Sequence, residues 1–176
     1  MVNKKIVILT GHFYPDNSAD SYLLTELAED LVLEGFDVGV LTRKPSYYIN
    51  INAPLNELYK GVVIERINSI RLNRQNLLLR VFDNLLFSFG LFVKSFKNRD
   101  GLVLVNTIPF MMPFVLYVLN KIYGQNYVLI NYEVLPELAG ETGVVKKEGV
   151  FYSLYNFAMK KVLKRASKVI VIGNDM

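Results

Sequence analysis

The stretch that decides the fold is Lys4-Lys5-Ile6-Val7-Ile8-Leu9-Thr10-Gly11, near the start of a 176-residue chain. Its apolar residues do not alternate with polar ones, which is typical of a strand buried on both faces of a parallel sheet. An amphipathic helical pattern follows over 20–34, and a second apolar run, FDVGVL, follows over 36–41. Because parallel neighbours need a crossover connection, this order predicts a parallel pair joined by a right-handed crossover.

The same alternation of strand and helix continues along the chain. We expect further strands at 62–67, 102–105, 127–130 and 168–172, and further helices at 77–96, 109–123 and 149–165. The segment 42–60 shows only weak periodicity and is expected to be a long loop. The sequence therefore predicts a single α/β domain over residues 1–176, Rossmann-like and doubly wound, with a mainly parallel sheet flanked by helices.

The helical segments carry apolar faces that we expect to be buried. In 77–96 the polar residues form only a narrow stripe, so we expect most of this helix to pack inside the domain. The alternative for this helix is an apolar partner or a membrane surface. The residues assigned to the buried faces of the first and last helices are Leu23, Leu24, Leu27, Leu31 and Val32, and Phe151, Leu154, Tyr155, Ala158 and Val162.

Composition excludes several classes of protein. Hydrophobic residues make up 52% of the chain and charged residues 20%, which excludes a disordered chain. The absence of cysteine excludes disulfides and thiolate metal sites, and it fits a cytoplasmic location. The stretches 77–96 and 102–119 are interrupted by charged residues, asparagine or proline, so we expect no transmembrane helix.

Positive charge gathers near the end of the chain. The formal net charge is +4, and residues 146–168 hold seven Lys or Arg and one Glu. A basic patch of this kind favours an anionic partner such as a nucleotide, a phospholipid head group or a lipid pyrophosphate, and the alternative is a solvated helix face. Together with the apolar helix, it predicts peripheral contact with the inner face of the cytoplasmic membrane. Nucleic acid is not expected, because no aromatic stacking platform accompanies the basic residues.

Polar residues follow several of the expected strands. The carboxyl ends of parallel strands form one edge of a sheet, and ligands of open α/β sheets bind in the crevice outside that edge. No residues with metal-ligand spacing, no Walker loop and no G-x-G-x-x-G loop are present, so neither a metal nor a cofactor is expected. The candidates are His12, Asp16, Asn17, Ser18, Asn106, Thr107, Glu133 and Glu137.

Motifs spread over nearly the whole chain resemble one known family. They are the strand 6–10 with Phe13-Tyr14-Pro15 and the small residues Ser18 and Ala19, then Leu24-Thr25-Glu26-Leu27-Ala28, Gly35-Phe36-Asp37-Val38 with Val40-Leu41-Thr42, Val103 to Thr107 with Pro109, Val128 to Glu137, and Arg165 to Ile172. In this order and spacing they resemble the amino-terminal domain of family 4 glycosyltransferases, of the type that synthesises bacterial polysaccharide.

The resemblance implies a GT-B architecture, in which two Rossmann-like domains face a cleft. The first domain binds the acceptor and the second binds most of the nucleotide-sugar. It implies transfer with retention of anomeric configuration and without a bound metal, to a glycan or polyprenyl-linked acceptor for lipopolysaccharide, capsule or similar surface polysaccharide. This chain is then expected to be the acceptor-side domain without its donor-binding partner, and incomplete as an enzyme by itself.

The sequence departs from the family pattern at two places. Ser18 and Ala19 stand where the first loop usually has glycine, whose absent side chain lets backbone amides approach a phosphate. Glu133 stands where the family usually has aspartate, and Leu135 stands at the usual aromatic position.

The resemblance also suggests roles for the candidate residues. Glu133 would orient the acceptor hydroxyl or accept its proton, with Glu137 in support or capping the next helix. His12, the only histidine, would bind sugar or phosphate or transfer a proton, although a lone histidine is often structural. The loop before the first helix would face the donor pyrophosphate. Asn106 and Thr107 would bind sugar hydroxyls or simply form a turn.

A second interpretation is not enzymatic. A Rossmann-like domain can also serve as a stand-alone binding module or as an interaction domain at the membrane surface, since fold alone does not determine function.

Overall fold

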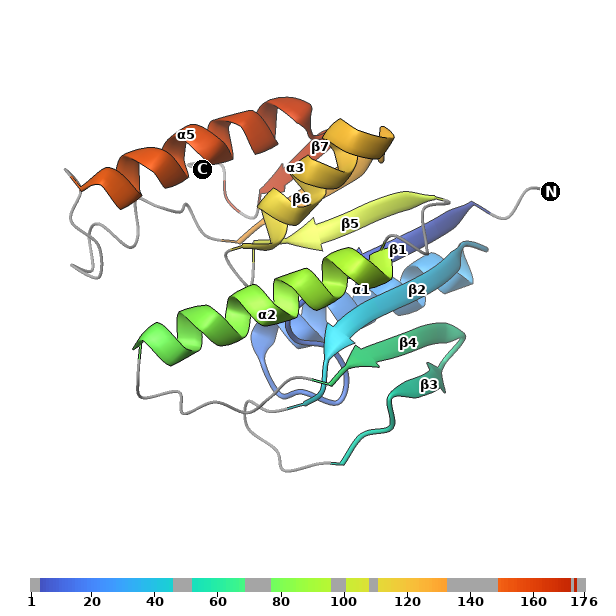
Figure 1. Ribbon diagram of the computed structural model, residues 1–176. Helices are drawn as coiled ribbons and strands as arrows, with labels where there is room; N and C mark the ends of the chain where they lie inside the picture. Colours follow the sequence, from blue (N-terminus) through green and yellow to red (C-terminus); the bar gives the residue numbers. More distant parts are fainter. Residues whose placement is uncertain are drawn as a thin grey trace.

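The computed structural model describes residues 4–45, 52–68, 77–95, 101–107, 111–132, 149–171 and 173. Within these residues a seven-stranded sheet has helices on both faces (Figure 1), which confirms the Rossmann-like α/β class with a mainly parallel sheet. The strands are β1 (Lys5–Leu9), β2 (Asp37–Arg43), β3 (Asn56–Tyr59), β4 (Val62–Ile67), β5 (Leu102–Asn106), β6 (Tyr127–Asn131) and β7 (Lys168–Val171).

The strands lie in the order β3-β4-β2-β1-β5-β6-β7, and every neighbouring pair is parallel except β3 and β4. β1 occupies the centre and pairs in register with both β2 and β5, so that Ile8 lies between Val40 and Leu104. The central position explains why the first apolar run shows no alternation, because both faces of β1 are covered.

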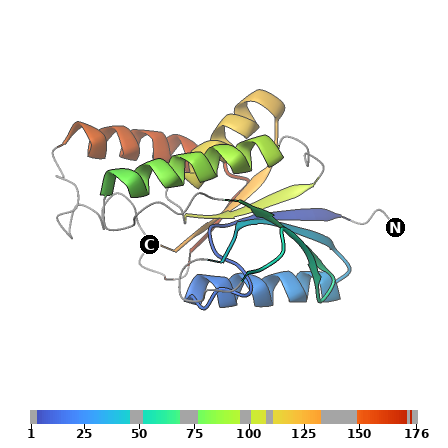
Figure 2. The same cartoon turned by 60° about the horizontal axis from the view of Figure 1, so that its bottom comes forward.

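The helices divide unequally between the two faces. α1 (Ala19–Leu33) covers one face, and α2 (Leu77–Ser95), α3 (Met112–Tyr123) and α5 (Val150–Arg165) cover the other (Figures 1 and 2). Each face of the sheet has its own hydrophobic core, and successive side chains of β1 point into them alternately. Ile6 and Ile8 pack with Leu24 of α1, whereas Val7 and Leu9 belong to the core under α2, α3 and α5.

The first helix ends as the sequence predicts. Gly35 has φ +85°, its N–H donates to the carbonyl of Val32, and the N–H of Phe36 donates to the carbonyl of Leu31. This pair of bonds is the Schellman arrangement, which satisfies two carbonyls at the end of α1 and turns the chain into β2.

The expectation of a long loop over 42–60 was wrong in part. β2 continues to Arg43, and β3 forms an antiparallel edge strand that is joined to β4 by Lys60 and Gly61. Both loop residues have positive φ, as a two-residue type I′ hairpin requires.

Some of the expected burial was also wrong. Leu23 and Leu154 point away from the domain and are exposed, and the outward side of α2 is exposed instead of packed inside. β7 forms where a strand was expected, but it lies at the edge of the sheet and all four of its residues are exposed. α3 begins at Met112, with Pro113 in its first turn, and Pro109 lies outside the described residues.

Replacing Gly101 with alanine is predicted to destabilise the domain strongly. Gly101 precedes β5 at φ +120°, and an added Cβ would lie 2.2 Å from the backbone oxygen of Lys5. Backbone strain and this clash together should lower the free energy of unfolding by about 3 kcal/mol or more, measured by urea denaturation. Gly39→Ala is the control, because its Cβ would meet nothing closer than 4.0 Å and should cost less than about 1 kcal/mol. Equal stability of the two variants would contradict the close approach of β5 to Lys5.

Candidate active site

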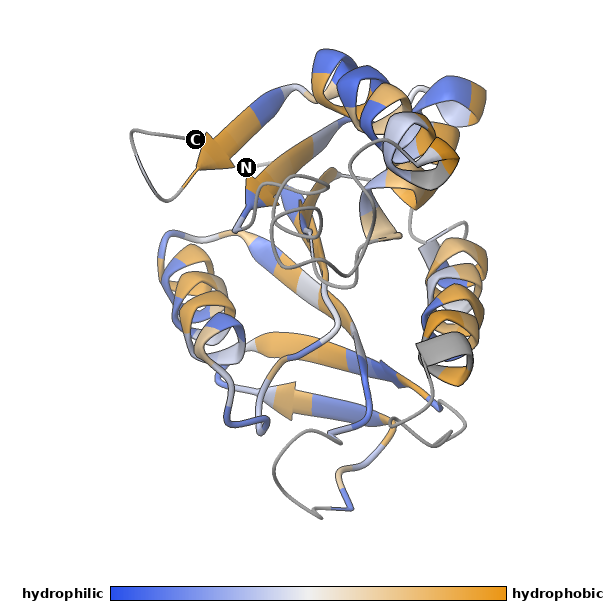
Figure 3. Cartoon of the chain, turned by 90° about the vertical axis from the view of Figure 1, so that its left-hand side faces the viewer, coloured by the Kyte–Doolittle hydropathy of each residue, from blue (hydrophilic) through white to orange (hydrophobic). Residues whose placement is uncertain are grey.

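The parallel sheet brings together candidates that lie far apart in the sequence. Thr10 follows β1, Asn106 ends β5, and Tyr132 follows β6, so all three lie at the carboxyl edge of the sheet. Figure 3 looks onto this edge, with α1 on one side and α2 on the other. The loop with His12, which leads from β1 to α1, lies at the same edge.

A chain of hydrogen bonds connects β5 to the loop after β1. The side-chain amide of Asn106 donates from Nδ2 to Thr10 Oγ1 over 3.2 Å, across 96 residues of sequence. Thr10 Oγ1 in turn donates to the carbonyl of His12 over 3.0 Å and accepts from the His12 N–H. Asn106 therefore supports the backbone that carries the only histidine.

The other end of the Asn106 amide has no partner. Asn106 is 1% exposed, and its Oδ1 is a buried acceptor without a hydrogen bond. A buried, unsatisfied polar atom costs stability, and such atoms are rare in folded proteins. A hydroxyl or amine donor from a ligand would satisfy this oxygen, so the atom marks a point where the edge is suited to binding.

His12 is held by a carboxylate. His12 Nδ1 lies 3.0 Å from Oδ2 of Asp20, in the first turn of α1, and both side chains are largely buried. A carboxylate at neutral pH only accepts, so the Nδ1–H tautomer of His12 donates to Asp20. Burial opposes ionisation of Asp20, but the hydrogen bond from His12, together with a backbone hydrogen bond at Ser21, outweighs it, and the pKa of Asp20 is lowered. The pair orients the imidazole as a carboxylate does in acid–base sites.

Thr107 connects β5 to the end of β6. Its Oγ1 accepts a hydrogen bond of 3.4 Å from the N–H of Tyr132. Burial, with a smaller effect from the negative charge of Asp20, raises the pKa of Tyr132 to about 12. Tyr132 therefore remains protonated at neutral pH and keeps a hydroxyl group that can donate a hydrogen bond.

The remaining described candidates lie in the loop before α1. Asp16 is buried and its N–H donates to the carbonyl of Phe13, which closes a tight turn. Asn17 is exposed and accepts a hydrogen bond from the hydroxyl of Tyr22. Ser18 is the N-cap residue of α1 but makes no side-chain capping bond. Glu133 and Glu137 lie outside the described residues.

Arg66 is a site-supporting residue that the sequence analysis missed. Its side chain is fully buried and donates to the carbonyl of Tyr14 over 2.8 Å and to that of Pro54 over 2.9 Å. It also pairs with Glu57 over 2.7 Å, and the ring of Tyr14 stacks on Tyr59 at 3.8 Å. Arg66 thus ties the loop after β1 to the β3 region. Its position in β4 could have identified it: Arg66 lies two residues after the buried Ile64, so its side chain is on the same, inward face of the strand.

A second arginine stands at the end of β2. Arg43 pairs with Asp83 of α2, approaches Asn84 of the same helix, and lies 4.4 Å above the ring of Phe87. In the parts of the chain that the structure describes, no group of three or more His, Cys, Asp or Glu residues is placed to hold a metal ion. Among the described helices, none has both the length and the apolar character needed to cross a bilayer.

The stability contributed by Asp20 should depend on pH. A carboxyl whose folded-state pKa is lowered contributes stability above its ordinary value of 3.8, and this contribution is lost as pH falls through the lower folded-state value. Asp20→Asn should therefore destabilise the domain at pH 7, by about 1–2 kcal/mol, and the difference from wild type should shrink at acid pH. Urea denaturation between neutral and acid pH measures this, with Asp30→Asn at an exposed position of the same helix as control. A pH-independent difference would show that Asp20 acts through packing alone.

Removing the Arg66 side chain should loosen the loop that carries His12. Arg66→Met leaves the carbonyls of Tyr14 and Pro54 without donors, which should lower the free energy of unfolding by about 3 kcal/mol. Arg66→Lys should recover only part of the loss, because an ammonium group cannot bridge three acceptors as the guanidinium does. Lys60→Met is the control, because Lys60 forms an exposed ion pair with Glu29, and its loss should change the free energy of unfolding very little. Full recovery by lysine would mean that charge alone is required at this position.

Comparisons with known proteins relate the chain to glycosyltransferases. Over 110 residues it is 32% identical to "Probable glycosyltransferase WbjE" of Pseudomonas aeruginosa, a match that covers 60% of this chain and 27% of that protein. Its structure superposes on sucrose-phosphate synthase from Thermosynechococcus elongatus with a TM-score of 0.60 and 16% identity, over 94% of this chain and 41% of that one. No family model matches the sequence. The chain thus spans well under half the length of either protein; it has sequence similarity to a glycosyltransferase and shares its fold with part of the synthase.

Proposed function

We propose that this chain is the acceptor-side domain of a retaining GT-B glycosyltransferase. The enzyme would transfer a sugar from a nucleotide-sugar to a glycan or polyprenyl-linked acceptor during synthesis of a bacterial surface polysaccharide. The reaction would take place in the cytoplasm, at the inner face of the membrane. The similarity to WbjE, the fold and the family motifs in the sequence support this proposal.

The observation that carries the proposal is the unsatisfied Oδ1 of Asn106 at the carboxyl edge of the sheet. A sugar hydroxyl is a donor of the kind that this buried acceptor lacks. Sites that hydrogen-bond a substrate hydroxyl through a buried group discriminate strongly against ligands without it. Asn106 would therefore both bind and select the acceptor sugar.

The neighbouring groups suit the charges of glycosyl transfer. As the bond to the leaving diphosphate breaks, positive charge develops on the sugar ring and negative charge on the phosphates. The acceptor hydroxyl must lose a proton as it attacks. His12, oriented by Asp20, and Glu133, which follows β6 in the sequence, are the candidate proton acceptors, and the hydroxyl of Tyr132 is an additional donor at the carboxyl edge.

The remaining parts of the enzyme would lie outside this chain. A second Rossmann-like domain would bind most of the nucleotide-sugar, with the amino end of α1 facing its diphosphate across a cleft. The active site would then be divided between two domains, with the acceptor on this one.

The proposal predicts loss of transfer without loss of folding when Asn106 is changed. In the product of the complete gene, Asn106→Leu should lower kcat/KM by about tenfold to a hundredfold, because one hydrogen bond to the acceptor is lost. The free energy of unfolding should fall by only about 1 kcal/mol, because the loss of the hydrogen bond to Thr10 is offset by removal of an unsatisfied buried oxygen. Glu133→Gln should abolish transfer.

The assay would use a panel of labelled nucleotide-sugars with an extract of lipid-linked acceptors, and circular dichroism would confirm that each variant is folded. Asn126→Leu is the matched control, since Asn126 is exposed at the opposite edge of the sheet, before β6. Wild-type activity in the Asn106→Leu variant would remove Asn106 from the site. Absence of transfer with every donor in the folded wild-type protein would favour a binding domain without catalysis.

A further inference from the structure

The outward face of α2 is apolar along its described length. Every described residue that points away from the sheet on this helix is a leucine, phenylalanine or valine, and Phe89 is 65% exposed. A helix that faces water normally carries charged or polar residues there. The residues of this outward face are Leu79, Phe82, Leu85, Leu86, Phe89 and Val93.

The polar side chains of α2 that the structure describes lie on the side toward the protein instead. Asp83 pairs with Arg43, and Lys94 pairs with Glu65 over 2.5 Å. Ser88 and Ser95 are buried. On its inner side α2 buries Phe87 and Leu91 in the core, and its described polar residues also lie on that side, so the exposed side is left without polar residues. Such a face is stable where it meets an apolar medium or partner.

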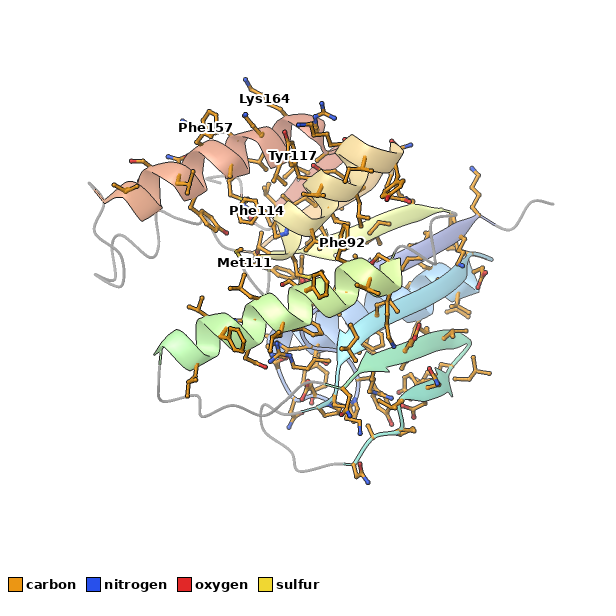
Figure 4. The ribbon with its side chains drawn as sticks, in the orientation of Figure 1. Phe92, Met111, Phe114, Tyr117, Phe157 and Lys164 are labelled. Atoms are coloured by element: carbon orange, nitrogen blue, oxygen red, sulfur yellow. The ribbon has the colours of Figure 1, made fainter. Side chains whose placement is uncertain are left out.

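The apolar surface continues onto the neighbouring helices. Figure 4 shows that Phe92, Met111, Phe114, Tyr117 and Phe157 follow one another from α2 across α3 to α5, and the first four of them are half-buried. α5 adds exposed apolar residues at Val150, Leu154 and Phe157. The outward residues of α2, the half-buried Phe114 and Tyr117 of α3, and the exposed residues of α5 together form what we call the three-helix face.

Basic side chains accompany the apolar residues of this face. The next turns of α5 carry Lys160, Lys161 and Lys164, all exposed, and the helix contains no acidic residue. The ammonium group of Lys161 lies 4.3 Å above the ring of Phe157. Aromatic rings next to lysines suit the boundary between lipid chains and head groups, where the ring is buried and the ammonium reaches outward.

The opposite side of the domain has the reverse charge. α1 carries Glu26, Glu29 and Asp30 and no basic residue. An anionic surface would therefore attract the three-helix face and repel the α1 face, which fixes how the domain lies on it. A second copy of the chain would bring lysine clusters into a like-charged contact, which is unfavourable.

From this arrangement we infer that the three-helix face binds the surface of an anionic lipid bilayer. The outward residues of α2 and Phe157 of α5 enter the boundary of the lipid chains, and the exposed lysines of α5 contact the head groups. α2 and α5 run opposite to the strands, so their amino ends lie at the carboxyl edge of the sheet. On the proposed function, this places the acceptor site beside the bilayer that holds a lipid-linked acceptor. The binding itself is independent of sugar transfer, since it needs neither donor nor acceptor.

Vesicle flotation with the 176-residue chain tests this inference. Vesicles of phosphatidylcholine mixed with phosphatidylglycerol should bind the chain, and vesicles of phosphatidylcholine alone should bind it much more weakly. Lys160→Gln/Lys161→Gln/Lys164→Gln should reduce binding to the anionic vesicles by about a hundredfold at low salt. Phe82→Gln/Phe89→Gln should reduce it by about tenfold or more.

The matched control is Leu23→Gln/Leu33→Gln, which removes two exposed leucines from α1 on the other face and should leave binding unchanged. All substituted positions are exposed, and circular dichroism checks that the variants are folded. The inference would be overturned if the chain does not bind anionic vesicles, or if it binds neutral vesicles equally well. It would also be overturned if the control variant loses as much binding as the lysine and phenylalanine variants. A dimer in light scattering that disappears in Phe82→Gln/Phe89→Gln, without vesicle binding, would instead assign the face to a second copy.

Discussion

The parallel pairing of β1 with β2 on one side and β5 on the other is the constraint on which the other features depend. The register places Leu9 beside both Leu41 and Val105, so the residues that follow these three strands emerge together. Only then can Asn106 donate to Thr10 across 96 residues of sequence. The burial of β1 on both faces makes this register costly to shift, because a slip of one residue would exchange the side chains of the two cores.

The polar groups at the carboxyl edge are held by a scaffold that is otherwise apolar. Asn106, Thr10 and Arg66 are each almost completely buried, and hydrogen bonds in such surroundings are stronger than in water. Arg66 holds the loop from one side and Asp20 holds His12 from the other. These described residues of the edge are therefore held in place by the protein itself, and the unsatisfied oxygen of Asn106 suggests where a ligand binds.

Much of the fold follows from local sequence patterns. The unbroken apolar run of β1, the helical spacing before Gly35 and the second run into β2 were sufficient to predict the parallel pair, and the same pattern predicted four of the five other strands. β3 was missed because Asn56–Tyr59 is short, polar and half-exposed, although the Lys60-Gly61 turn pointed to a hairpin. The exposure of β7 could not be foreseen, since the same apolar residues fit a central or an edge strand.

The candidate site was predictable in position and less so in detail. Parallel strands share a carboxyl edge, so the nearness of His12 and Asn106 followed from the fold class. The partners of these residues could not be predicted. In the sequence, Asp20 looks like an ordinary acidic residue in the first turn of a helix, and Arg66 looks like an ordinary charged residue in a strand. Likewise, the polar stripe of α2 was visible in the sequence, but its direction was not, because it depends on partners such as Arg43 and Glu65.

The central claim is that the carboxyl edge of the sheet binds the acceptor sugar through Asn106 and the loop after β1. Titration of the ¹⁵N-labelled chain with acceptor oligosaccharides, followed by NMR, tests it most directly. The account predicts that the shifts concentrate on the side-chain amide of Asn106 and on Thr10, His12 and Thr107. Shifts at the opposite edge, around Lys5, Gly101 and Asn126, with none at Asn106, would contradict it.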